Sequence, residues 1–228
     1  MIPEYLSQNP LMHMDMIVPI KRGTAQILYA SKDGVCLKDT KSGAYMLSAK
    51  SYAIGDQMLN LLPTNGLFTF HQDFMLDSFK VKVRYKTSIV NFQTVYFSTE
   101  PCPVSNNIEL KPLNISHFDV ITKHYGVDVG LDYVHDTITE GRLFGGFAGH
   151  NLVGFVGIHA EGSIGFLKVF DQYRNKGYGT ALAGHITNYQ LSHKAVPFAQ
   201  ICIDNAVSLA VFKRVGFQIS TEKVYWLF

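Results

Sequence analysis

The sequence is short of cysteine, and the few it has are spread apart. Its 228 residues include three cysteines, Cys36, Cys102 and Cys202. They form no CxxC pair, which argues against a disulfide framework and against a thiolate zinc site. We expect all three to be reduced, and we expect Cys202 to lie in the core because it sits in an apolar run.

The chain also has little net charge. The chain has 20 Lys and Arg against 18 Asp and Glu, a net charge of +2. No strong field therefore selects nucleic acid or an anionic membrane as partner, and specificity must come from a site. The nine histidines show no HxH or HExxH spacing, so we predict no metal site.

No stretch reaches the roughly 18 apolar residues that a membrane span needs. Glu4, Pro10 and Asp15 interrupt the first 23 residues, which therefore do not resemble a secretory signal. We expect a cytoplasmic protein with no membrane partner. Since 47% of the residues are hydrophobic and only 17% charged, the chain can fill a sizeable core.

Residues 1–100 predict a smaller α+β domain of hairpins and short helices. Glycine-containing turns separate three short apolar segments, and Pro63 stops a helical one. The expected strands cover 24–30, 35–40, 44–49, 66–70 and 88–97, and the expected helices cover 53–62 and 72–79. The sequence of this half does not indicate a function.

Residues 101–107 predict a linker, because the surrounding stretch is rich in proline and asparagine and has no apolar periodicity. Residues 108–228 then predict an α/β domain with a mixed central sheet and flanking helices. Its expected strands are 108–113, 143–149, 152–160, 163–170, 197–203 and 218–227. Its expected helices are 116–125, ended by Gly126, and 131–140, 177–193 and 206–215.

The most informative stretch, residues 167–182, runs from a strand through a basic loop into a helix. The loop carries Arg174 and Lys176, and Gly177 and Gly179 begin the helix. Helix N-termini hold anions through unpaired N–H groups, and glycines let a phosphate approach the backbone. The stretch is neither a Walker A loop nor a GxGxxG fingerprint, because Leu182 stands at the third glycine position.

The pattern Arg174-x-x-Gly177-x-Gly179 after a strand resembles the acetyl-CoA pyrophosphate loop of the GNAT superfamily of N-acetyltransferases. Asn205-x-x-Ser208, followed by a Gly-Phe pair, resembles the same family's last helix and its lead into the final strand. The resemblance covers 108–228, and its details are similar to the subgroup that includes glycine N-acyltransferase. In that subgroup a degenerate N-terminal half often precedes the catalytic half, which suits residues 1–100.

The resemblance implies that the strand with Leu167 and Val169 parts from its parallel neighbour and pairs with the pantetheine arm, although both side chains also suit ordinary core. Asn205 would contact the coenzyme or cap the last helix, and Ser208 belongs to the same motif. The residues implied to hold the pyrophosphate are Arg174, Asn175, Lys176, Gly177, Tyr178, Gly179 and Thr180. For Arg174 and Lys176 the alternative is a solvated surface charge.

Phe212 departs from the family pattern, which commonly has a tyrosine that protonates the departing thiolate. Another donor, a solvent-mediated step or an inactive protein that only binds acyl-CoA would each account for the phenylalanine. The family's usual strand glutamate is also absent. The nearest ionisable groups, His159 and Glu161, are candidates for a base or a water-orienting group, against ordinary packing or surface roles.

Together these features predict an acyl-CoA-dependent N-acyltransferase with acetyl-CoA as co-substrate. It would transfer acetyl to a small-molecule or amino-acid-like amine by direct attack in a ternary complex. The alternative is a non-catalytic acyl-CoA-binding or sensing module. The resemblance places the acceptor pocket within residues 116–142. The amine, the acyl-chain preference and the oligomeric state, a homodimer included, stay open.

Overall fold

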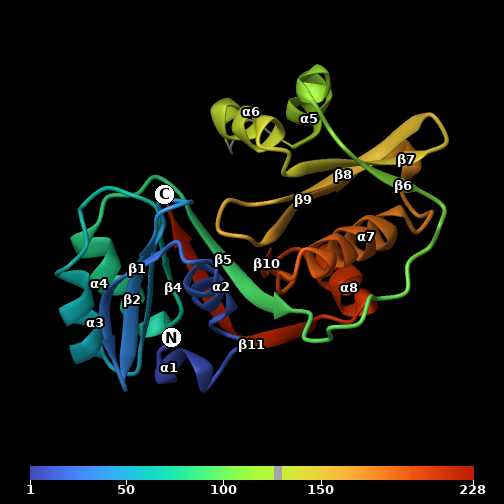
Figure 1. The fold of residues 1–228 in the computed structure, drawn as a ribbon. Coiled ribbons are helices and arrows are strands. Elements are labelled where there is room, and N and C mark those ends of the chain that lie inside the picture. The colour runs from blue at the N-terminus through green and yellow to red at the C-terminus, as the bar shows by residue number, and fades with distance from the viewer. Residues whose placement is uncertain (126–129) are drawn as a thin grey trace. The chain divides into compact units, whose positions relative to one another are not determined.

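The computed structural model describes residues 1–125 and 130–228, which form two compact units (Figure 1). Unit 1 consists of Met1–Val95, Gln200–Ala206 and Gln218–Phe228, and unit 2 of Tyr96–Ala199 and Val207–Phe217. The first division falls near the linker predicted at 101–107. The C-terminal strand, by contrast, lies with unit 1 and not with the half of the sequence that it follows.

Unit 1 is a mixed sheet with helices. Its strands are β1 (Ala25–Ser31), β2 (Gly34–Asp39), β3 (Tyr45–Ala49), β4 (Phe68–Phe70), β5 (Ser88–Val95) and β11 (Gln218–Leu227). Its helices are α1 (Glu4–Ser7), α2 (Met14–Arg22), α3 (Tyr52–Leu59) and α4 (Leu76–Lys82). The strand order is β1-β2-β3-β4-β11-β5, with β3 and β4 parallel and the other register pairs antiparallel. Sequence reasoning missed α2, which contains Pro19.

Unit 2 also contains strands that run in mixed directions. Its strands are β6 (Glu109–Pro112), β7 (Leu143–Ala148), β8 (Asn151–Ile158), β9 (Ile164–Val169) and the start of β10 (Phe198–Cys202), in the order β10-β9-β8-β7-β6. Its helices are α5 (Phe118–Tyr125), α6 (Leu131–Thr139), α7 (Tyr178–Ser192) and α8 (Ala206–Val215). Asn114 caps the turn that leads into α5, instead of the predicted Ser116. Gly126 lies outside the described residues.

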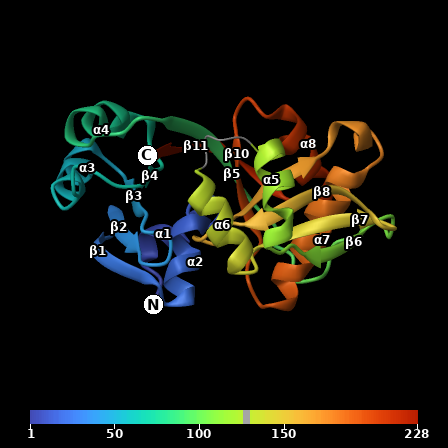
Figure 2. The ribbon, with the colours of Figure 1, turned by 90° about the horizontal axis from the view of Figure 1, so that it is seen from above.

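In unit 2, α5 and α6 cover one face of the strands and α7 covers the other (Figure 2). Two glycines in the strands let α7 pack closely against the sheet. A Cβ at Gly146 would lie 2.8 Å from Leu182 of α7, and one at Gly154 would lie 3.2 Å from the same side chain. The close approach fixes the N-terminus of α7 relative to β9.

The two halves of the chain repeat one order of elements. Each half runs through two helices, three antiparallel strands, a helix, a strand, a helix and a strand, from α1 to β5 and from α5 to β11. The parallel pair β3–β4 corresponds to β9–β10. The predicted mixed sheet with flanking helices is therefore confirmed, and the N-terminal half has the same α/β order. Unit 1 nevertheless takes its β11 from the second half.

The predicted linker is held against α7. Asn188 accepts a hydrogen bond from the Cys102 amide and donates one to the Cys102 carbonyl, both at 2.9 Å. Cys36 and Cys102 are buried, but Cys202 is only half-buried, so the expectation that Cys202 lies in the core is wrong. Among the described helices, none is long and apolar enough to cross a membrane.

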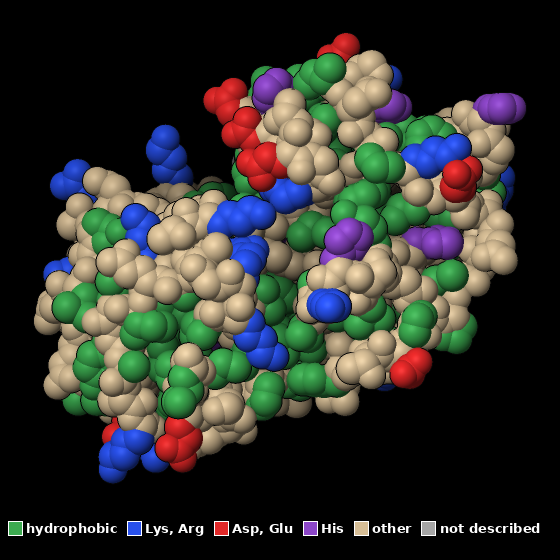
Figure 3. All heavy atoms as spheres, in the orientation of Figure 1, with side chains coloured by type: hydrophobic (Ala, Val, Ile, Leu, Met, Phe, Trp, Pro, Cys, Tyr) green, Lys and Arg blue, Asp and Glu red, His purple; other side chains and the backbone are tan. Residues whose placement is uncertain are grey.

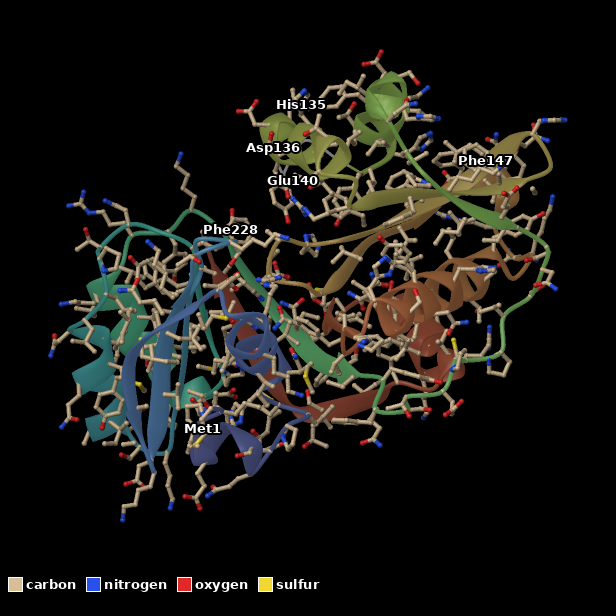
Figure 4. The ribbon with its side chains drawn as sticks, in the orientation of Figure 1. Met1, His135, Asp136, Glu140, Phe147 and Phe228 are labelled. Carbon is tan, nitrogen blue, oxygen red and sulfur yellow. The ribbon has the colours of Figure 1, made fainter. Side chains whose placement is uncertain are left out.

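The apolar core of unit 1 includes the C-terminal strand. Phe70 of β4 stacks on Phe79 of α4 with ring centroids 4.2 Å apart, and on Tyr225 of β11 at 4.9 Å. Leu227, also on β11, is fully buried. Figure 4 labels Met1 and Phe228, the two chain ends, both of which belong to unit 1.

A buried charge pair links α2 to the residue after β4. His71 Nε2 lies 2.9 Å from Asp15 Oδ1, and His71 Nδ1 lies 2.8 Å from the Leu47 carbonyl oxygen. An ionised carboxylate and a carbonyl only accept, so both ring nitrogens carry protons. Burial alone would lower the pKa of His71, but Asp15 raises it above the ordinary value.

His13 is the neutral partner in this network. Its Nε2 lies 2.8 Å from Ser48 Oγ, and its ring centroid lies 5.4 Å from that of His71. Burial, together with the neighbouring His71, lowers the pKa of His13 from 6.5 to about 4. One buried histidine is thus charged and the next is not.

This contrast predicts a loss of stability in acid. Between pH 6.5 and about 4 the unfolded chain protonates His13 while the folded chain does not. The free energy of unfolding therefore falls as the pH drops through this interval, by on the order of 3 kcal/mol from this group. Denaturant unfolding of wild type and His13→Gln across the interval measures the effect. Equal pH slopes in the two proteins would contradict it.

Candidate functional site

The site is organised by the course of β9. Along one edge β9 pairs with β8 over most of its length. Along the other, within the described residues, its register with β10 is the single pair Ala199↔Ile164. Leu167 and Val169 lie beyond that pair, on the edge of β9 for which the described residues of unit 2 supply no further register partner. An extended ligand can pair with the backbone of such an edge.

A bulge lies in the same part of β9. Phe166 has a φ of +56°, unusual for a residue other than glycine, and the β8–β9 register shifts beside it. Such a backbone costs on the order of 1–2 kcal/mol and is kept only where packing holds it. Phe166 is 1% exposed and stacks on Tyr125 with centroids 4.5 Å apart. Sequence reasoning missed this bulge, for which the adjacent Gly165 is a weak signal.

The loop after β9 ends in a helix start without protein partners. Gly177, with φ +79°, is the N-cap of α7 and makes no side-chain cap. The first helical bond runs from the Ala181 amide to the Gly177 carbonyl. Among the described residues, the N–H groups of Tyr178, Gly179 and Thr180 have no hydrogen-bond partner. They can donate to an anion.

Gly179 lies where a ligand would meet the helix. A Cβ added there would be 3.7 Å from Val169 of β9 and 3.7 Å from Val211 of α8, which is ordinary contact. Gly177, in contrast, has open space but a positive φ. The two glycines therefore have different roles. Gly177 allows the positive φ of the turn, and Gly179 leaves space beside the unpaired amides.

The two basic residues of the loop are exposed. Arg174 Nη2 lies 2.7 Å from Asp171 Oδ1 in a surface ion pair, and Lys176 Nζ lies 5.8 Å from the centre of the Tyr173 ring. Surface ion pairs contribute little to stability, so a bound anion can replace Asp171 as the partner of Arg174 at little cost in free energy. Asn175, with φ +62°, shapes the turn between them.

On α8, Phe212 is 2% exposed and its ring meets Phe217 edge-on with centroids 4.9 Å apart. Ser208 is half-buried on the same helix. Asn205 precedes the helix, is exposed, and its amide donates to the Cys202 carbonyl at 2.9 Å. Asn205 belongs to unit 1 and the loop to unit 2.

The other candidates meet before β9 begins. His159 Nδ1 lies 2.8 Å from the hydroxyl of Tyr133, a residue of α6 that sequence reasoning did not single out. Glu161 is 7% exposed and accepts a short hydrogen bond from Ser163 Oγ. Arg142 donates to Glu140 Oε2 at 2.8 Å and to the Ile158 carbonyl at 2.7 Å.

Burial and neighbouring charges act on this cluster. Burial, with the charge of Glu161, raises the pKa of Tyr133 to about 12, while Arg142 and the Ala160 amide oppose the rise. Burial lowers the pKa of His159, and Arg142 lowers it further, against Glu161. Both side chains are therefore uncharged near neutral pH.

The loop leads from β9 into the N-terminus of α7, whereas Phe212 lies on α8. His159 and Glu161 precede β9, and His159 contacts Tyr133. Among the described residues, no three His, Cys, Asp or Glu side chains are placed to hold a metal. The face drawn in Figure 3 carries basic and acidic side chains together.

Comparison with known proteins bears on the fold. Residues 149–227 match the family model described as FR47-like protein. A Drosophila protein solved by a structural genomics consortium is similar over 98% of this chain and 93% of its own, with a TM-score of 0.72 at 14% identity. A GNAT-family acetyltransferase from Colwellia psychrerythraea is similar over 100% of this chain and 98% of its own, with a TM-score of 0.55 at 12% identity.

A tandem GNAT protein from the clavulanic acid biosynthesis pathway is similar over 93% of this chain and 86% of its own, with a TM-score of 0.50 at 15% identity. A search of curated protein sequences finds no match. At these identities the likeness establishes the fold. The chain has the GNAT acetyltransferase fold, with an FR47-like match in its second half.

The packing of α8 yields a stability prediction. Phe212→Ala removes a buried ring and should lower the free energy of unfolding by about 3–5 kcal/mol. Val207 lies on the same helix with 77% of its surface exposed, so Val207→Ala should change it by less than about 0.5 kcal/mol. Denaturant unfolding compares them. Similar losses in both variants would show that Phe212 is not a core residue.

Proposed function

We propose that this chain is an acyl-CoA-dependent N-acyltransferase similar to the glycine N-acyltransferase subgroup. The observation that carries the proposal is the N-terminus of α7, whose first N–H groups have no hydrogen-bond partner among the described residues. The GNAT fold supports it. Bound acetyl-CoA would supply the activated acyl group.

The residues fit such a co-substrate. The amides of Tyr178, Gly179 and Thr180 would hold the pyrophosphate, with Arg174 and Lys176 adding charge at its edge. The backbone of β9 around Leu167 and Val169 would pair with the pantetheine arm. Asn205 and Ser208 remain proposed coenzyme contacts.

The acceptor would be an amine. Asp132 and Asp136 are exposed on one side of α6, and the exposed Glu140 follows four residues later as the C-cap; Figure 4 labels the last two. This acidic side favours the approach of a cation. Glu161, buried beside Tyr133 and His159, would take or relay the proton that the amine loses.

Phe212 has no proton to give to a departing thiolate, and it is sealed in the core. A thiolate needs little help to leave, so solvent can protonate it. The same residue favours the second candidate, a non-catalytic acyl-CoA-binding module. Thiol release measured with a panel of amines separates the two, because a binding module would release none.

Unit 1 lacks the corresponding site. Only Lys50 and Ser51 separate β3 from α3, and β3 and β4 remain paired over three consecutive residues, Tyr45↔Phe68 to Leu47↔Phe70. There is neither a loop to hold phosphate nor a parted edge. We therefore propose one coenzyme for each chain, bound in the second half.

Coenzyme binding gives the central prediction. At a hundredfold excess over its dissociation constant, CoA should stabilise the protein by about 2.7 kcal/mol and raise its melting temperature. Gly179→Val should abolish the shift, since its branched side chain fills the clearance beside the amides. The unliganded variant should melt close to wild type, because an added Cβ meets its neighbours only at 3.7 Å.

Gly177→Val should also abolish the shift, but with a lower melting temperature because φ is +79°. Gly23→Val is the matched control: Gly23 has φ +81° with open space around it, and it lies outside the loop. Gly23→Val should lower the melting temperature by a similar amount, and CoA should still raise the melting temperature of this variant as it does for wild type. Unchanged melting of wild type at millimolar CoA would overturn the proposed function.

The acceptor preference follows from the shortage of bases. An amine of pKa about 10.4 is neutral in about one molecule in 2,500 at pH 7, whereas a peptide α-amine of pKa about 7.7–8.0 is neutral in roughly one in five to ten. We predict higher kcat/KM at pH 7 for the weakly basic amine. Efficient acetylation of lysine-like amines that survives Glu161→Gln would contradict this.

A further inference from the structure

The predicted linker ends in a segment, residues 102–107, that lies along α7. The Asn188 side chain of α7 bonds both backbone groups of Cys102, each at 2.9 Å. Gly184, one turn earlier on α7, makes room for Val104, because a Cβ there would lie 2.6 Å from Val104 Cγ1. The segment therefore has a fixed place beside the helix.

The end of this segment reaches the start of α7. His185 Nε2 lies 3.3 Å from the Ser105 carbonyl oxygen, and Asn107 Nδ2 donates to the Lys176 carbonyl oxygen at 3.4 Å. A carbonyl only accepts, so the nitrogen of the Asn107 amide must face it. The next residue, Ile108, is 5% exposed. The backbone is thus held on both sides of Asn107.

The Lys176 carbonyl belongs to the peptide group that precedes Gly177, the N-cap of α7. A trans peptide group is planar, with its C=O and its N–H pointing in opposite directions. Since the oxygen is held toward Asn107, the Gly177 N–H points away from segment 102–107. Like the amides of residues 178–180, this N–H has no hydrogen-bond partner in the described part of the chain.

Glycine leaves the orientation of this peptide group open. Turning the group over changes ψ of Lys176 and φ of Gly177, and glycine accepts a φ of either sign. Gly177 has φ +79°, with open space around it. The reversed group would present the Lys176 oxygen where the N–H now lies, and an oxygen repels phosphate. Among the described residues, Asn107 is the only hydrogen-bond partner of that oxygen.

We propose that Asn107 selects the orientation of the Lys176–Gly177 peptide group in which the Gly177 N–H joins the unpaired amides of α7 in binding the pyrophosphate of the coenzyme. The inference rests on the proposed function. Asn107 is a positioning residue, because it acts through the backbone of the loop. A residue of the predicted linker thereby sets the affinity for coenzyme.

The orientation of the peptide group can be measured without ligand. Residual dipolar couplings of weakly aligned, ¹⁵N-labelled protein report the direction of the Gly177 N–H. In wild type we expect the coupling of the orientation with φ +79°. In Asn107→Ala we expect a coupling averaged over both orientations, with the couplings of α7 unchanged. Equal Gly177 couplings in the two proteins would overturn the proposal.

Coenzyme binding tests the consequence. A hydrogen bond of ordinary net strength shifts an equilibrium by about threefold to tenfold, and the Kd rises as the binding-competent fraction falls. In calorimetric titrations, Asn107→Ala should therefore raise the Kd for CoA about threefold to tenfold. Asn107→Leu keeps the shape but cannot donate, and should behave alike. The control is Asn106→Ala, at an exposed neighbouring position, which should bind CoA like wild type. An unchanged Kd in Asn107→Ala, or an equal rise in the control, contradicts the assignment.

The effect must depend on the phosphates. S-acetylpantetheine carries the same thioester as acetyl-CoA but no phosphate. With acetyl-CoA as donor, Asn107→Ala should raise the KM and leave kcat unchanged. With S-acetylpantetheine, kcat/KM should equal that of wild type. Equal losses with both donors would mean that the substitution disturbs the fold in general, and the positioning role would then be rejected.

Failure of this inference differs from failure of the proposed function. If wild type shows neither CoA binding nor a CoA-dependent melting shift, the proposed acyltransfer fails and the role of Asn107 fails with it. If wild type binds CoA and Asn107→Ala binds it equally well, only the role of Asn107 fails.

Discussion

The bulge in β9 at Phe166 is the constraint on which the site depends. One residue, Phe166, takes the unfavourable dihedral angle that turns the strand, and aromatic packing from α5 and α6 holds it there. The same rings place His159 over Gly165. The bulge of β9 and the position of the His159 ring thus depend on one aromatic cluster.

Unit 1 shows what the same order of elements gives without this constraint. Its β3 and β4 stay paired, the loop to α3 is short, and a buried polar network around Asp15 and His71 lies between α2 and the sheet. Not every buried group of unit 1 is satisfied, because Thr69 Oγ1 and Gln93 Nε2 have no hydrogen-bond partner among the described residues.

The sequence was most informative where the structure depends on residues that are close together in the chain. Apolar alternation and glycine turns predicted the meanders, and Arg174, Gly177 and Gly179 predicted the loop, because glycine near a helix start has a direct backbone cause. The sequence did not predict features that depend on contacts between residues far apart in the chain. Nothing local marks Tyr133 as the partner of His159, 26 residues away, or the positive φ of Phe166. The sequence did not predict α2, because Pro19 interrupts its helical pattern. It did not predict the pairing of β11 with β4 and β5 either, because apolar alternation does not specify which strands pair.

The exchange of β11 has a consequence for synthesis on the ribosome. Domains ordinarily fold in the order in which they emerge. Here β11 lies between β4 and β5, so the first-made half of the chain has a gap in its sheet until β11 has left the exit tunnel. The exposed edges of β4 and β5 must stay soluble while the second half is made. The sheet of unit 1 is therefore completed only after the second half of this sequence has been made.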